Sequence, residues 1–216
     1  MNHDVFVRLR EAARDAAVSE RDSVVVPATL DATVAVVRVC AETATPLAVR
    51  SAAAGSTVAA PPGGVLVSLD RISGVELHAP ALTLRAGAGA GTAAVRQRAA
   101  AAGLALVGVG EGPLTASVGA LVARGLVSRR SLTGVEAVLA TGETIAFGGV
   151  LKDVVGYDIP SLLLGTMGRL AVLLTATFRL EPAGARTVSP PAPGVVTPDP
   201  SLTRAFDPQE LLRSSA

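Results

Sequence analysis

Two loops of small residues could bind an anion, because each sets hydroxyl groups beside backbone amides with little side-chain cover. The first, Arg50-Ser51-Ala52-Ala53-Ala54-Gly55-Ser56-Thr57, directly follows a short apolar segment that predicts a strand. The second, Gly112-Pro113-Leu114-Thr115-Ala116-Ser117-Val118-Gly119-Ala120, precedes a predicted helical turn. Consecutive amides with Ser and Thr hydroxyls can surround a phosphate. Two such loops, separated by strands, predict one extended ligand between two layers, although the Ala-rich loop by itself favours a purely structural turn.

A third small-residue loop, Gly87-Ala88-Gly89-Ala90-Gly91, lies between a predicted strand and a predicted helix, and a second strand ends near Glu111. This is the layout of a βαβ unit that binds a dinucleotide at a helix N-terminus. However, the third glycine of G-x-G-x-x-G falls on Thr92, and no further βαβ repeat follows. We therefore favour a tight turn that needs small residues, and keep a nicotinamide-binding unit as a minor alternative.

The composition excludes several other kinds of site. Cys40 is the only cysteine, which rules out an internal disulfide, a CxxC pair and a cysteine-ligated iron–sulfur cluster. The two histidines, His3 and His78, lie far apart in the sequence, which argues against a catalytic triad or a histidine metal site. A net charge of +1 and 2% aromatic residues give no support for nucleic-acid binding.

The chain also lacks a long apolar run free of Gly, Pro or charge, so we expect no membrane insertion. Its first residues carry acids and arginines at helical spacing, unlike a signal peptide, and we expect a cytoplasmic protein.

The elements that position these loops follow from hydrophobic periodicity and turn residues. Helices are expected within the first eighteen residues and over Asp31–Thr43, Thr92–Ala102 and Ile159–Leu164, with a helical turn after Ser117. Strands are expected over Ser23–Val26, Leu47–Arg50, Val65–Leu69, Gly74–Leu77, Leu82–Ala86, Leu104–Val109, Val135–Ala140, Thr144–Phe147 and Leu170–Leu180. We expect Asp31 to cap its helix. Paired strands with interspersed helices predict an α+β domain with two sub-layers.

The segment from Lys152 to Pro182 carries the most specific pattern. It reads Lys152-Asp153-Val154-Val155-Gly156-Tyr157-Asp158, then Gly165-Thr166-Met167-Gly168-Arg169-Leu170-Ala171-Val172-Leu173, and closes on Pro182. It resembles the K-(N/D)-x-x-G-Y-D … G-(S/T)-x-G-x-L-(G/A)-(I/V)-(I/L) … P block of FAD-linked oxidases in the p-cresol methylhydroxylase/vanillyl-alcohol oxidase superfamily. Within this superfamily, the segment resembles in particular the FAD-binding subunit of glycolate oxidase. The likeness continues back to about Val24 and implies a PCMH-type domain of two α/β subdomains with FAD between them.

The resemblance also implies which residues would contact FAD. The first loop would bind the pyrophosphate, the second would lie along the diphosphate and isoalloxazine, Arg124 and Gly125 would lie near the flavin edge, and Ala171-Val172 would form the other wall. The implied contacts are Arg50, Ser51, Ala52, Ala53, Ala54, Gly55, Ser56, Pro113, Thr115, Ser117, Val118, Gly119, Leu121, Arg124, Gly125, Ala171 and Val172. Family members with covalent flavin use His or Cys in the first loop; Ala and Ser stand there, so we expect non-covalent FAD.

Two departures from the family pattern bear on function. Ala52, Ala53 and Ala120 replace usual glycines, which restricts positive φ and close approach to phosphate. Family members also insert a substrate-binding cap domain after the strand that ends near Pro182. Here the proline-rich residues 183–200 lead directly to a tail, 201–216, in which Phe206–Leu212 resembles the family's closing F-D-P motif. We therefore expect a FAD-binding domain over 1–182, a linker in place of the cap, and a C-terminal tail.

Two functions fit these observations. The first is the FAD-binding subunit of an oxidoreductase complex acting on a 2-hydroxy acid or similar alcohol, with a flavoprotein or iron–sulfur partner subunit that completes the substrate site and electron transfer. The second is a non-catalytic partner of a related flavoprotein, with FAD binding weakened or lost. The small-molecule substrate and the catalytic residues cannot be read from the sequence.

Overall fold

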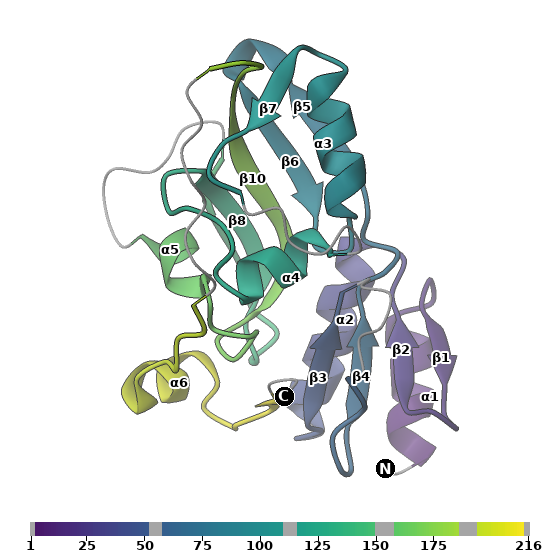
Figure 1. Cartoon of the computed structure of the whole chain (residues 1–216). Helices are drawn as coiled ribbons and strands as arrows, with labels where there is room; N and C mark the ends of the chain where they lie inside the picture. The colour runs from purple at the N-terminus through teal and green to yellow at the C-terminus, as the bar shows by residue number, and fades with distance from the viewer. Residues whose placement is uncertain (1–2, 52–57, 110–115, 150–157, 186–193, 214–216) are drawn as a thin grey trace.

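Two sheets organise the chain, and each has its own hydrophobic core (Figure 1). The computed structural model describes residues 3–51, 58–109, 116–149, 158–185 and 194–213. Mixed α/β architecture with two sub-layers was expected from the sequence, and the structure confirms it.

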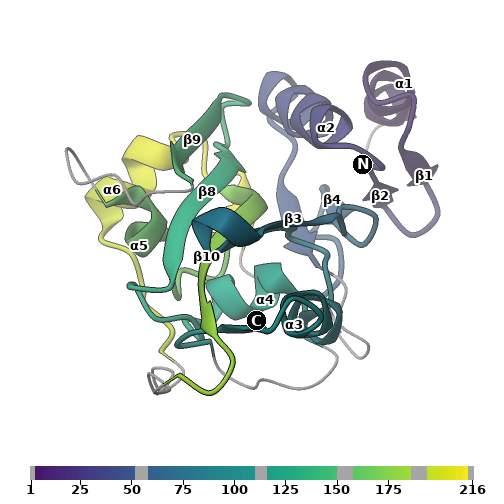
Figure 2. The same cartoon turned by 90° about the horizontal axis from the view of Figure 1, so that it is seen from above.

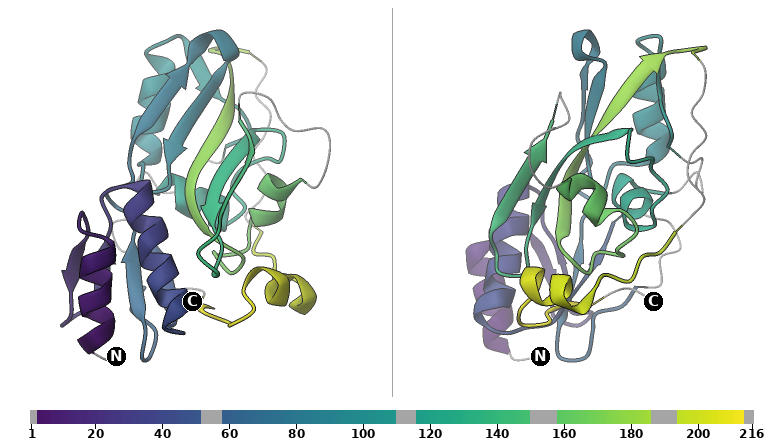
Figure 3. Two further views of the ribbon diagram at one scale, coloured as in Figure 1. Left: turned by 180° about the vertical axis from the view of Figure 1, so that it is seen from behind. Right: turned by 90° about the vertical axis from the view of Figure 1, so that its left-hand side faces the viewer.

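The first sheet has the strand order β1-β2-β4-β3-β11. Its strands are β1 (Ala17–Ser19), β2 (Val24–Val26), β4 (Val65–Ser68), β3 (Leu47–Arg50) and β11 (Leu212–Arg213). All neighbouring pairs are parallel except β1 with β2. Helices α1 (His3–Ala12) and α2 (Leu30–Glu42) cover one face of this sheet (Figure 3). Parallel strands are buried on both faces, which explains why β4 is buried along its whole length.

The start of α2 differs from the expectation in its capping residue. Thr29, in an extended conformation (φ −131°, ψ 164°), is the N-cap, and its side chain accepts a hydrogen bond from the Ala32 amide at 3.1 Å. Asp31 lies inside the first turn, where its charge still interacts favourably with the helix dipole. The prediction of Asp31 as the cap was wrong, because the chain becomes helical before it.

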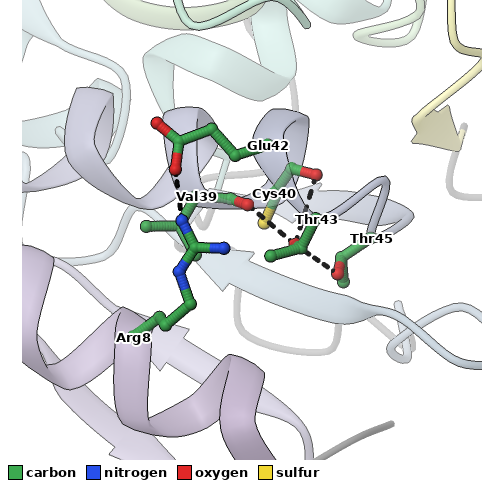
Figure 4. A network of polar contacts seen from close by, with 6 residues as sticks. All are labelled: Arg8, Val39, Cys40, Glu42, Thr43 and Thr45. Atoms are coloured by element: carbon green, nitrogen blue, oxygen red, sulfur yellow. Dashed lines mark hydrogen bonds and ion pairs between the residues drawn. The ribbon is translucent and has the colours of Figure 1, made fainter.

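Polar contacts at the other end of α2 tie it to α1 (Figure 4). The Arg8 guanidinium of α1 forms an ion pair with the Glu42 carboxylate. The Thr43 hydroxyl donates to the Val39 carbonyl at 2.7 Å and lies 2.7 Å from the Thr45 hydroxyl. These bonds satisfy groups at the helix end that have no partner within the helix.

The thiol of Cys40 lies in the same region but is fully buried in the first core. Burial raises the pKa of the Cys40 thiol from its ordinary 9.0 to about 12. Because the folded-state pKa is raised, the stability contributed by the neutral thiol is present below pH 9.0 and is lost as the pH rises toward about 12.

We predict that Cys40 of the folded chain does not react with an aromatic disulfide reagent at pH 8, because the thiolate is the reacting form. The released chromophore reports the reaction. The same chain unfolded in urea serves as the control and should react to completion. Equal rates with and without urea would contradict the buried position of this thiol.

The second sheet is antiparallel, with the strand order β5-β6-β10-β8-β9. Its strands are β5 (Val75–His78), β6 (Thr83–Gly87), β10 (Val172–Pro182), β8 (Leu132–Val138) and β9 (Thr144–Gly148), and β7 (Leu104–Leu106) pairs with the end of β10. A short 3-10 helix, Ala79–Ala81, joins β5 to β6. Helices α3 (Thr92–Ala100), α4 (Val118–Ala123) and α5 (Ile159–Leu163) lie on one face of this sheet (Figure 1).

The two layers meet where β8 and β10 reach the first core. Val138, Ala140, Val172 and Leu174 belong to the cluster of buried residues that also contains α2 and β4 side chains. Seen from above, α1 and α2 lie on one side of the molecule and α3 and α4 on the other (Figure 2).

The described chain beyond β10 returns to the first sheet. Residues 194–199 lead to α6 (Pro200–Phe206), and β11 then adds to the edge of β3. The sequence predicted neither β11 nor β1. The strand predicted over Leu104–Val109 is also shorter in the structure: β7 ends at Leu106, and Val109 forms an isolated bridge with Val127.

Candidate functional site

The two loops predicted to share a ligand meet at a pair of serine hydroxyls. Ser51 directly follows β3 of the first sheet, and Ser117 directly precedes α4 of the second layer. The Ser117 hydroxyl donates to the Ser51 hydroxyl at 2.7 Å. Because this bond uses the Ser117 proton, the Ser51 hydroxyl keeps its own proton for another acceptor. The bond therefore joins the two layers at the point where the sequence predicts the pyrophosphate.

The beginning of α4 is fixed by its own hydrogen bonds. The Ser117 side chain accepts from the Ala120 amide at 3.2 Å and so caps the helix. The Val118 amide donates to the Ala90 carbonyl at 2.9 Å, and the Gly119 amide donates to the Ala88 carbonyl at 2.8 Å. These three amides are used within the protein, so the part of this site that the structure describes offers hydroxyl groups rather than α4 amides as donors.

Gly119 allows the close approach of the two loops. A Cβ atom at this position would lie 2.8 Å from the Ser51 hydroxyl oxygen and 3.1 Å from the Ala88 carbonyl oxygen. Neither distance leaves room for a methyl group without a shift of a neighbour, so glycine at 119 is a requirement of the Ser51–Ser117 contact.

Arg50 brings a positive charge to the same end of β3. Its guanidinium donates to the Ser68 hydroxyl at 3.2 Å and lies 3.9 Å from an Asp70 carboxylate oxygen. Both charged side chains are partly exposed, so this ion pair is weak. It nevertheless holds Arg50 at the carboxyl end of two neighbouring strands, β3 and β4, where ligands of parallel sheets commonly bind.

The loop Gly87-Ala88-Gly89-Ala90-Gly91 supports this site structurally. A Cβ at Gly87 would collide with the Ile72 carbonyl, and one at Gly89 with the Leu69 carbonyl. Strands β6 and β7, on either side of α3, both pair antiparallel with β10. The two strands therefore run parallel to one another, as they do in a βαβ unit. However, the amides of Ala88, Gly89 and Ala90 donate to the carbonyls of Leu174, Ile72 and Gly87, whereas a dinucleotide-binding loop keeps such amides for the pyrophosphate. The glycines of this loop therefore serve a tight turn between the layers, which is the interpretation we favoured from the sequence.

The remaining predicted contacts divide into three groups. The side chains of Val118, Leu121, Ala171 and Val172 are buried in the cores, so only their backbones could reach a ligand. Arg124 and Gly125 lie at the opposite end of α4 from Ser117. Ala52, Ala53, Ala54, Gly55, Ser56, Pro113 and Thr115 lie outside the described residues, as do residues 150–157 of the motif that begins at Lys152.

Sequence reasoning missed three contributors to this site. Ala88 and Ala90 hold α4 through their carbonyl oxygens, and Gly91 forms a β-bridge with Ser117. Only the small size of these residues could have indicated their role, because a backbone carbonyl can accept a hydrogen bond whatever the side chain is.

The described ranges contain no group of three or more His, Cys, Asp or Glu side chains that could hold a metal ion. None of the helices found in those ranges is long and apolar enough to cross a membrane.

The chain thus combines one mostly parallel and one antiparallel sheet, with a site of small residues where the two layers meet. The family model described as "FAD binding domain" matches residues 22–148, more than half of the chain. The chain belongs to this family of FAD-binding domains and is of the p-cresol methylhydroxylase type that the sequence motifs resemble.

Curated relatives agree with this assignment. An uncharacterized FAD-linked oxidoreductase of Mycobacterium tuberculosis is 33% identical over 168 residues, which cover 72% of this chain and 37% of the relative. Glycolate oxidase subunit GlcD of Bacillus subtilis is 41% identical over 75 residues, covering 33% of this chain and 16% of the relative. The matched residues thus span well under half of these relatives.

Solved structures share the fold. Phl p 4.0202, a glucose dehydrogenase, superposes with a TM-score of 0.69 at 17% identity over 83% of this chain and 44% of that one. A variant of berberine bridge enzyme superposes with a TM-score of 0.68 at 13% identity over 84% of this chain and 43% of that one.

The described part of the site fits FAD. The Ser51–Ser117 pair supplies a hydroxyl donor, Gly119 leaves the backbone bare beside it, and residues 87–91 and 116–120 contain no acidic side chain that would repel a diphosphate.

Proposed function

We propose that this chain is the FAD-binding part of a flavin-dependent oxidoreductase that acts on a 2-hydroxy acid or a similar alcohol. The observation that carries the proposal is the Ser51–Ser117 contact, which unites the two predicted pyrophosphate loops in a fold of the FAD-binding family. Bound FAD would supply the redox step by accepting a hydride from the alcohol carbon. The chain's own residues would bind and orient the cofactor.

The substrate class rests on the named relatives. Glycolate and lactate, named in the glycolate oxidase subunit and in the D-lactate dehydrogenase of Archaeoglobus fulgidus, are both 2-hydroxy acids. The latter is 40% identical over 81 residues. Residues 183–200 stand where the family resemblance places a substrate domain, so we propose that a flavoprotein or iron–sulfur partner subunit completes the substrate site and accepts the electrons.

We propose further that FAD is held non-covalently. The first loop contains neither His nor Cys. Cys40 is buried in the first core, while His3 and His78 lie in α1 and at the end of β5, away from the Ser51–Ser117 contact in sequence and fold. Denaturation should therefore release all of the flavin into the filtrate.

The Ser51→Ala substitution is predicted to weaken FAD binding by roughly tenfold, because it removes the free hydroxyl donor at the junction of the loops. It leaves the α4 cap in place but removes the acceptor of the buried Ser117 hydroxyl, so the apo chain should lose about 1 kcal/mol of stability. Titration of the purified chain with FAD, followed by flavin fluorescence, measures the affinity.

Two matched variants sharpen this test. Ser19→Ala removes a hydroxyl that bonds to Asp22 at the far edge of the first sheet, and it should bind FAD like the wild type. Ser117→Ala removes both the hydroxyl contact and the α4 cap, so it should also lose about 1 kcal/mol of stability. Wild-type affinity in Ser51→Ala would contradict the placement of the diphosphate.

A second candidate is a non-catalytic partner of a related flavoprotein. Ala52 and Ala53 in place of the usual glycines favour it, because each methyl group hinders approach to phosphate. A purified chain that takes up no FAD, yet associates with a co-expressed flavoprotein, would favour this second function over the first.

A further inference from the structure

The residues just before α6 lie across the end of α4. The Gly194 amide donates to the Arg124 carbonyl at 3.3 Å, and the Val196 amide donates to the Gly165 carbonyl at 2.8 Å. These residues, 194–196, belong to the connection that follows β10, and we refer to them as the strap.

The strap rests on two glycines that are held as one unit. The amides of Gly125 and Gly165 both donate to the Val122 carbonyl, at 3.1 and 2.9 Å. Both glycines have positive φ, +67° and +78°. A Cβ at Gly125 would lie 2.7 Å from the Gly194 carbonyl oxygen, and a Cβ at Gly165 would collide with the same atom. The backbone of the strap packs directly on the backbone of Gly125 and Gly165, which we call the seat of the strap. No side chain fits at either position of the seat.

Two backbone hydrogen bonds hold the strap, and its side chains add little apolar burial. Val195 is 66% exposed and Val196 is 54% exposed, although a Val196 methyl group lies beside Gly165. Pro198, two residues further on, is buried and anchors the chain next to the strap. Because most of the stability of docked segments comes from buried apolar area, residues 194–196 are the part of this connection that is released when the two hydrogen bonds are lost.

The seat lies at the far end of the helix that carries the predicted diphosphate contact. α4 has six residues and is about 9 Å long. Ser117 caps its beginning, and Arg124 and Gly125 follow its end. In FAD the ribityl chain separates the diphosphate from the flavin ring, so a cofactor whose diphosphate lies at Ser117 and which runs along α4 brings its ring toward Gly125.

We propose that the strap covers the edge of the flavin ring at the end of α4 and controls access of solutes to it. This inference rests on the proposed function, since it assumes FAD with its diphosphate at Ser51 and Ser117. The strap then occupies the place in the chain where the family resemblance puts a substrate domain, and its release exposes the ring to a substrate or to an electron acceptor.

The Val196→Pro substitution tests the strap, because proline has no amide hydrogen to donate to Gly165. Val196→Ala is the matched control, since it shortens the same side chain and keeps the amide. In the FAD-loaded chain we measure quenching of flavin fluorescence by iodide. We expect Val196→Pro to raise the quenching constant at least twofold and Val196→Ala to leave it at the wild-type value.

Two outcomes overturn the inference, and they are distinguishable. Equal quenching constants in FAD-loaded wild type and Val196→Pro overturn the strap alone and leave the proposed function standing. A wild-type chain that binds no FAD overturns the proposed function and the strap together. Hydrogen–deuterium exchange provides a second measurement that needs no variant: the Val196 amide should exchange more slowly than the Val195 amide, and equally fast exchange of both contradicts the closed strap.

Discussion

Gly89→Ala is expected to lower the free energy of unfolding by roughly 3–5 kcal/mol, because the substitution forces a steric conflict with backbone atoms of a packed turn. The added methyl group would collide with the Leu69 carbonyl and would lie 3.1 Å from the Ile72 carbonyl oxygen. Both obstacles are backbone atoms, and the Gly89 amide itself donates to the Ile72 carbonyl at 2.9 Å. To relieve this collision, the turn that contains Gly89 would have to move away from Leu69 and Ile72, which follow strand β4 of the first sheet. Urea denaturation followed by far-UV circular dichroism measures the change.

Gly91→Ala is the matched control within the same loop. Gly91 precedes α3 with φ −67° and ψ 136°, values open to any residue, and no atom lies within 4 Å of a Cβ built there. Its stability should stay within about 0.5 kcal/mol of the wild type. A loop that served a dinucleotide would instead lose ligand affinity while its stability stayed intact. Equal stability of the two variants would falsify the structural role of Gly89.

This pair of glycines shows where sequence reasoning reached its limit. The repeat Gly87-Ala88-Gly89-Ala90-Gly91 is nearly symmetric in letters, so nothing local separates Gly89 from Gly91. The difference arises because Leu69 and Ile72, from the end of the first sheet, approach one glycine and not the other. Tertiary contacts decide which glycine is required.

Local signals, by contrast, placed most elements and the outline of the site. A short apolar segment predicted β3 with its observed bounds, and Ser117 before an apolar run predicted the turn that is α4. The capping error at α2 has a local cause too. Thr29 and Asp31 are both residue types that commonly cap helices. Their types alone do not show at which of them the chain becomes helical, and this makes Thr29 the cap.

The strap and β11 were beyond prediction for a different reason. β11 has two residues, too few for periodicity, and it pairs in parallel with β3 from the other end of the chain. The strap is held by backbone amides and carbonyls, which every residue except proline provides. The proline-rich composition of the connection predicted an extended chain, but not where that chain would lie.

The tail that carries β11 is fixed by one buried carboxylate. Asp207 follows α6 and is 1% exposed. Its two oxygens accept hydrogen bonds from the Leu211 amide at 2.8 Å and the Leu212 amide at 2.7 Å. The Leu47 amide at the start of β3 then donates to the Leu211 carbonyl at 2.8 Å. Asp207 therefore turns the chain so that β11 meets the strand that leads to Arg50 and Ser51.

We expect Asp207→Ala to destabilise the chain by about 3 kcal/mol, because it leaves two buried amides without an acceptor and each costs about 1–3 kcal/mol. The predicted loss should be smaller in Asp207→Asn, whose side-chain oxygen can still accept one of the two bonds. Thermal and urea unfolding of both variants provide the measurement. Since β11 adjoins β3, the FAD affinity of Asp207→Ala should fall as well.

Asp199→Ala is the control for this prediction. Asp199 caps α6 by accepting from the Ser201 amide at 2.8 Å, and hydrogen bonds from the Ser201 hydroxyl and amide lower the pKa of its carboxyl group. It is fully exposed, so water replaces part of its bonds when the carboxylate is removed. Loss of this helix cap should therefore destabilise the chain clearly less than Asp207→Ala does. If Asp207→Ala were no less stable than Asp199→Ala, the buried carboxylate would not be what holds β11 against β3, and the edge of the first sheet would be fixed by the packing of Leu211 and Leu212 alone.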